Sequence, residues 1–200
     1  MSSHIAAYDL PLPDNWYWIP PVGQAPEGWQ RAMAERLAVG DDPDNVAAIA
    51  EQLADVHTTV AEAGFDNVRT AVGVSASLFG QLIGLMTVRC RQDIGLEDFG
   101  LELAQVTEGD EETVFDQIDR FTTVLPAGRA SGAHVIMGTL GQDELGQTVR
   151  VLEERVLVAV APPNCADLVE VMAIAAGLGC FPRMTETFLA FLHPLTIQTR

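Results

Sequence analysis

The four histidines are the residues best suited to acid–base chemistry or metal binding, and they are scattered. They are His4, His57, His134 and His193, and no HExxH motif or other paired arrangement joins them. His57 lies near the edge of an apolar stripe, where a lone histidine is more often a packed or surface residue than a catalytic one. We therefore predict no catalytic histidine.

The three cysteines, Cys90, Cys165 and Cys180, are odd in number and lack CxxC spacing. This pattern argues against a disulfide framework and against a zinc site, so we predict free, reduced thiols and no bound metal. The acidic run from Glu108 to Glu112 lacks the alternating oxygen spacing of a calcium loop. A solvated loop or the start of a helix is the favoured interpretation of that run.

Motifs for nucleotide binding and nucleophilic catalysis are incomplete. There is no Walker A sequence, and the glycines of GLGCFP, after Ala176, lack the third glycine and the helix of a dinucleotide fingerprint. The stretch GVSAS, which ends at Ser77, has only the first glycine of a GxSxG nucleophile elbow. We predict no cofactor and no catalytic residue, and hence a protein that is not an enzyme.

Two tryptophans are the candidate partner-binding residues. Trp16 and Trp18 alternate with Asn15 and Tyr17, which is the period of a strand. Such a pair either forms a face on which a ligand stacks or seals one edge of the core, because aromatic side chains dominate burial. The sequence leaves both interpretations open.

The charge of the chain narrows the classes of partner. Among 200 residues, 28 are acidic and 11 basic, and the formal net charge is -17. Because phosphate binding needs a cationic surface, we do not expect nucleic acid or an anionic membrane as a partner. A basic protein or peptide remains compatible with this charge. We otherwise expect a solvated acidic surface.

The sequence lacks features of export or membrane insertion. Its first residues carry no charged region followed by an apolar region, and its apolar runs are too short to span a bilayer. We expect a cytoplasmic protein without membrane insertion. The apolar content of 48% is sufficient for a sizeable core. We predict a tail over residues 1–7 and a single α+β domain over residues 8–200.

Helices and strands are predicted from the spacing of apolar residues. Amphipathic spacing predicts helices at 26–39 and from about 44 to 63, the second capped by Asp44 or Asn45, and a last helix at 182–193. The last carries an apolar stripe that should dock on the sheet. Residues 93–120 are hard to interpret, and 114–118 suggest helical turns. Strands are predicted over residues 67–77, 78–91, 121–125, 133–140, 149–160 and 168–177.

Several phrases resemble a known family. The stretches YDLPLPDNWYWIP, FTTVLPAGRASG and VLVAVAPPNCADLVEVMAIAAG, followed by a final amphipathic helix, are similar to the PsbP-like domain found in many uncharacterised actinobacterial proteins. The resemblance implies an antiparallel sheet of about six strands packed against helices. It also implies a binding or assembly factor rather than an enzyme. The lipobox cysteine of the family's lipoproteins is absent.

The expected function is that of a non-enzymatic protein-binding or assembly factor, chaperone-like, with a protein partner. The alternative is a small-molecule-binding protein with a pocket between sheet and helices. A third hypothesis is an enzyme with a dispersed site. An exposed apolar patch favours the first, a closed pocket with converging polar groups the second, and a buried histidine–carboxylate contact in a cleft the third. Homo-oligomerisation is left open.

Overall fold

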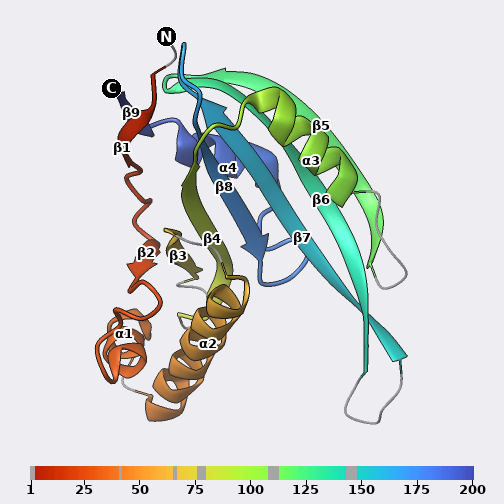
Figure 1. Ribbon diagram of the computed structural model, residues 1–200. Coiled ribbons are helices and arrows are strands. Elements are labelled where there is room, and N and C mark those ends of the chain that lie inside the picture. The colour runs from red at the N-terminus through yellow and green to blue at the C-terminus, as the bar shows by residue number, and fades with distance from the viewer. Residues whose placement is uncertain (1–2, 41, 65–66, 76–79, 108–112, 143–147) are drawn as a thin grey trace.

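A seven-stranded antiparallel sheet organises the chain (Figure 1). The computed structural model describes residues 3–40, 42–64, 67–75, 80–107, 113–142 and 148–200. The fold is α+β, as predicted, with one strand more than the expected six. In spatial order the strands are β2 (Trp16–Ile19), β3 (Arg69–Val74), β4 (Leu82–Arg91), β8 (Leu168–Ala175), β7 (Thr148–Ala161), β6 (Gly128–Gln142) and β5 (Thr113–Leu125).

The central strand β8 has apolar side chains on both faces, as its sequence predicts. Val169, Val171 and Ala173 are buried on one face, and Met172 and Ile174 are half-buried on the other. β8 lies between β4 and β7, so both of its edges are hydrogen-bonded. A strand covered on both faces to this extent has a nearly continuous run of apolar residues.

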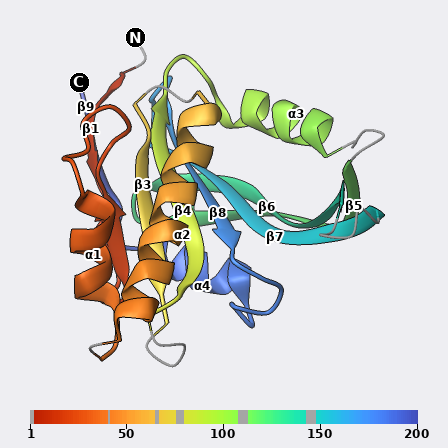
Figure 2. The same ribbon diagram turned by 90° about the horizontal axis from the view of Figure 1, so that it is seen from below.

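Helices cover both faces of the sheet (Figure 2). Helices α1 (Trp29–Leu37) and α2 (Pro43–Glu62) pack on β3 at Val72, and α3 (Leu96–Val106) packs on β6 at Val135. The strand register places those two valines on the same face. The opposite face carries α4 (Met184–Leu192).

Helix α4 docks through the stripe that its sequence predicts. Met184, Phe188 and Leu195 are buried, and Phe191 is half-buried. The Phe188 ring is fully buried and makes edge-to-face contacts with the rings of Trp16 and Phe181. Such contacts add to the stabilisation from burial itself.

Both remaining helix predictions are confirmed, with a shifted cap. The side chain of Asp42 accepts a hydrogen bond from the Asp44 N–H at 3.0 Å, and Pro43 occupies the first turn. The predicted caps, Asp44 and Asn45, therefore lie just inside α2. Proline fits there because the first N–H of a helix has no intrahelical partner.

The predicted tail over residues 1–7 was too long. Strand β1 (Ile5–Asp9) pairs with β9 (Thr196–Thr199) in a two-stranded antiparallel ribbon, with Ile5 opposite Thr199. Ile5 is buried against the same core as α4. Strand β9 was not predicted, because four residues at one end of the chain give no readable period.

The predicted helical turns at 114–118 were wrong, because this segment is the first part of β5. A β-bulge between Phe115 and Gln117 inserts one residue into the strand. Phe115 and Ile118 consequently lie on the same face, packed against α3, although they are three positions apart. Three positions is also the spacing of one helix face, which explains the error.

Among the described residues, no helix has both the length and the apolar character required to cross a membrane. The longest helix, α2, has 20 residues, and several of its positions are charged. Two residues of its apolar stripe, Ile49 and Leu53, are instead buried in one cluster with Val72 of the sheet.

Candidate functional site: a groove at the free edge of β2

A groove of about 680 Å³ follows the outer edge of β2. Its walls are the segment Asp9–Leu12, which continues from β1, and the start and first turns of α1. Its floor contains Trp16, Tyr17 and Trp18. Three prolines and Met33 add to this lining, so most of the surface is apolar or aromatic.

The two tryptophans, predicted as partner-binding residues, both line this groove but differ in exposure. Trp16 is only 3% exposed and contacts the rings of Phe188 and Phe191 at 5.6 Å. A Cβ atom at Gly73, its cross-strand neighbour, would lie 2.6 Å from the indole. Trp16 therefore fixes β2 to the core, and Trp18, which is half-buried, offers side-chain surface to the groove.

The main chain of β2 exposes unpaired hydrogen-bonding groups to the groove. The N–H of Val74 donates to the Asn15 carbonyl, which fixes the phase of the β2–β3 ladder. Tyr17 and Ile19 therefore bond to β3, and the N–H and C=O of Trp18 point to the free edge. Among the described residues, no main-chain group forms a hydrogen bond with the N–H or the C=O of Trp18. An edge of this kind is a template for another strand.

The charged groups around the groove are exposed. Asp9, Glu27 and Arg36 line its rim, two acids against one base. This excess follows the net charge of the whole chain, -17. The charged residues of the rim thus include one more acid than base.

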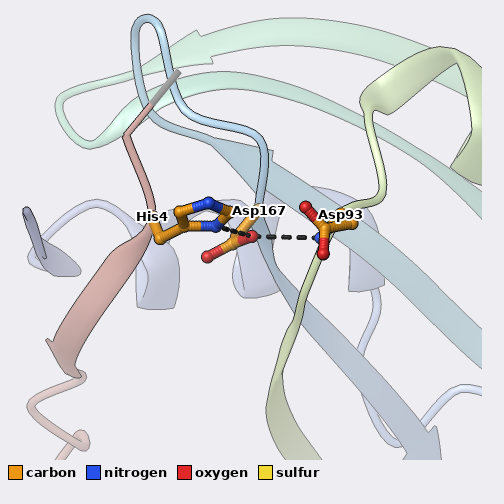
Figure 3. A group of neighbouring side chains, drawn as sticks. All are labelled: His4, Asp93 and Asp167. Atoms are coloured by element: carbon orange, nitrogen blue, oxygen red, sulfur yellow. Dashed lines mark hydrogen bonds and ion pairs between the residues drawn. The ribbon is translucent and has the colours of Figure 1, made fainter. Parts of the chain in front are cut away.

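A cluster of polar side chains, separate from the groove, joins three distant segments near the start of β1 (Figure 3). The Asp167 carboxylate has no exposed surface and accepts hydrogen bonds from His4 Nδ1 at 3.0 Å and from the N–H groups of Ile5 at 2.8 Å and Asp93 at 3.0 Å. Its hydrogen bonds thereby fasten β1 and the turn after β4 to the start of β8. Asp93 adopts φ 54°, in the left-handed region.

The arrangement of His4, Asp93 and Asp167 has the ligand types of a cation site, with ligand atoms within 4.8 Å of one another. The Asp167 oxygens are already occupied by three N–H donors. A metal would have to displace some of these bonds, so we interpret the cluster as structural. His4 and Asp167 are 163 positions apart, and no sequence motif could indicate their contact.

Both pKa values in this cluster shift in the direction that favours an ion pair. The hydrogen bond to Asp167 and the charge of that carboxylate raise the pKa of His4, and Asp93 adds to the effect while Arg200 opposes it. Burial alone would raise the pKa of Asp167. The hydrogen bonds from His4 and from two main-chain N–H groups outweigh burial and hold that pKa below its usual value.

We expect the contribution of His4 to stability to depend on pH. The stabilisation from protonated His4 is fully present below its usual pKa of about 6.5 and is lost as the pH rises through the raised pKa of the folded protein. The contribution of Asp167 is lost when the pH falls through its lowered pKa. The melting temperatures of wild type and His4→Gln, measured from acid to alkaline pH, should therefore differ most between about pH 4 and 6.5.

The matched control is His193→Gln, at an exposed position after α4. This variant should show no comparable dependence on pH. A constant difference between wild type and His4→Gln across the whole range would contradict the ion pair.

A histidine–carboxylate contact of the kind expected for an enzyme is present at His134. Its Nε2 lies 2.9 Å from Glu154 Oε1, and Glu154 Oε2 accepts the Gly179 N–H at 3.2 Å. Asp119 lies 3.8 Å from the other ring nitrogen. None of these residues lines the groove. Glu154 fastens the loop after β8 to β7, and this gives the contact a structural role.

The cysteines are half-buried free thiols. Burial, together with the charge of Asp167, raises the pKa of Cys90 and lowers its nucleophilicity at neutral pH. The acidic run at 108–112, considered above for calcium, lies outside the described residues.

Comparison with known sequences assigns no family to this chain. No protein-family model and no curated protein matches the chain. The groove at β2 and the charge of the chain are the features that indicate a function.

Proposed function

We propose that this chain is a non-enzymatic protein-binding factor that takes up an extended segment of a partner protein along the free edge of β2. The observation that carries the proposal is the unpaired main-chain N–H and C=O of Trp18 within an aromatic groove. An added strand would satisfy these groups, and the pockets beside it would select side chains. Direct main-chain pairing needs no catalytic residue.

The chemistry of the groove specifies the partner segment. Trp18, Met33 and Pro11 offer apolar contact to alternate side chains of an extended peptide. The acidic rim and the net charge of -17 favour basic residues next to the apolar ones and accelerate the encounter at low salt. A second copy of the chain would carry the same charge, and this repulsion disfavours it as the occupant.

The proposed role is that of an assembly or chaperone-like factor of the cytoplasm, within the PsbP-like group. The antiparallel sheet packed against helices supports this group, and the free thiols support a reducing compartment. A small molecule is the alternative occupant, since about 680 Å³ suffices for one. The free main-chain N–H and C=O of Trp18 favour a polypeptide, because one residue of an added strand satisfies both groups.

The test uses 12-residue peptides selected from a random displayed library against the full chain. We expect Trp18→Pro to weaken their binding at least tenfold, about 1.4 kcal/mol, and by more than Trp18→Ala does. Proline removes an N–H that points away from β3, so β2 itself should persist. Fluorescence polarisation gives the affinities, and hydrogen exchange should show protection of the Trp18 amide in the complex.

Val124→Ala, at a side chain 78% exposed on β5, is the matched surface control and should leave peptide binding unchanged. The melting temperature of Trp18→Pro shows whether the fold is retained. Peptides that bind wild type and a folded Trp18→Pro variant equally would contradict strand addition at this edge.

A further inference from the structure

A second cavity, of about 730 Å³, lies between β1 and the start of β3. The residues with polar side chains that line it are Tyr8, Gln24, Asn67, Arg69, Cys90 and Gln92. Among the described residues that line it, Arg69 is the one charged side chain. In a chain with 28 acidic and 11 basic residues, such a lining is locally cationic.

Arg69 is held in place without a carboxylate partner. Its guanidinium carbon lies 4.0 Å above the ring of Trp18, in a cation–π contact. Among the described residues, no ion pair includes Arg69, whereas six other arginines pair with aspartate or glutamate. Stacking uses the flat face of the guanidinium and leaves its in-plane N–H groups available. Arg69 is thus an oriented donor whose charge is not neutralised.

The remaining polar groups of the cavity are neutral and can complete a binding site. The three amides offer N–H donors and carbonyl acceptors. The Tyr8 hydroxyl donates to the Val88 carbonyl at 3.3 Å, so its oxygen is still able to accept. Ala6 and Ala7 add small apolar surface from β1. The volume lies within the range of small-molecule sites.

We propose that this cavity binds a small organic anion through a carboxylate group that pairs with Arg69. A guanidinium matches the two oxygens of a carboxylate with parallel hydrogen bonds. One cation balances one negative charge, whereas a phosphate dianion would remain undercompensated within a protein of net charge -17. The site is separate from the proposed protein-binding groove but touches it, because Trp18 lines the groove and supports Arg69.

The experiment titrates the full chain with three probes of similar size: benzoate, benzyl alcohol and phenyl phosphate. Isothermal titration calorimetry gives the affinities, and ¹⁵N–¹H spectra of the arginine Nε groups report which guanidinium responds. We expect benzoate to bind and to shift the Arg69 resonance, with benzyl alcohol and phenyl phosphate each at least tenfold weaker. Arg69→Gln should weaken benzoate at least tenfold.

Arg129→Gln, at an exposed arginine on β6, is the matched control and should bind benzoate like wild type. Arg69→Lys keeps the charge without the planar fork and should be weaker than wild type, and the melting temperature of each variant verifies its fold. The proposal is overturned if no probe binds, if benzoate binding survives Arg69→Gln, or if benzyl alcohol binds equally well. Tighter binding of phenyl phosphate would overturn the assignment to carboxylates.

Discussion

Replacing Phe188 by alanine is expected to lower the free energy of unfolding by about 3–5 kcal/mol. The ring is fully buried and contacts Trp16, Phe181 and Phe191. Its removal leaves a cavity between α4 and the sheet, and the rigid rings around it can fill that space only in part. Urea denaturation followed by circular dichroism measures the change.

Phe191→Ala supplies the comparison, since this ring belongs to the same cluster but is only half-buried. Phe191→Ala should lower the free energy of unfolding clearly less than Phe188→Ala does. Equal losses, or an unchanged midpoint for Phe188→Ala, would show that α4 does not dock through this face.

Asp167→Ala should be the next most destabilising change, by about 2–5 kcal/mol, because each buried donor left without a partner costs about 1–3 kcal/mol. The substitution removes the acceptor of the Ile5 and Asp93 N–H groups and the partner of His4. Hydrogen exchange should show β1 opening before the sheet. Denaturation at pH 6, where the His4–Asp167 pair is charged, gives the magnitude.

Asp55→Ala is the matched aspartate control, at an exposed position of α2. It should change stability by no more than about 0.5 kcal/mol. If Asp167→Ala were equally mild, the cluster would not fasten the N-terminal strand to the sheet.

Elements with a regular apolar period could be predicted from the sequence. The stripe of Ile49, Leu53 and Val60 gave α2, and that of Met184 and Phe188 gave α4. In both helices apolar residues recur at helical spacing on one face, so the period is regular. The central strand β8 was predictable for a similar reason, since both of its faces are covered.

Irregularities and distant pairings could not be predicted. The bulge at Phe115 changes the period of β5 from two to three, which imitates a helix. The β1–β9 ribbon joins Ile5 to Thr199 through four or five residues on each side, too few for a pattern. Both features depend on neighbours that only the folded chain supplies.

The candidate site was predictable only at its centre. The alternation of Trp16 and Trp18 indicated a strand with aromatic side chains on one face. Which of the two is exposed depends on α4, which covers Trp16, and on Arg69, which stacks on Trp18. Arg69 itself gave no signal, because a single arginine in a short strand is an ordinary surface residue until its partners are known.

Because β8 lies between β4 and β7, strand β4 gains one of its two neighbours only late in the synthesis of the chain. When Arg91 leaves the ribosome, β4 has β3 on one side but lacks its other neighbour, and the apolar side chains of Met86 and Val88 lack the cover of α4. Leu168 follows about 77 residues later, a delay of about 4–15 s at ordinary rates of translation. A sheet of β2, β3 and β4 that formed in this interval would have an open edge at β4. The N-terminal half of the chain is completed only by the last third of the polypeptide, and we expect slower synthesis to prolong the period in which it is prone to aggregate.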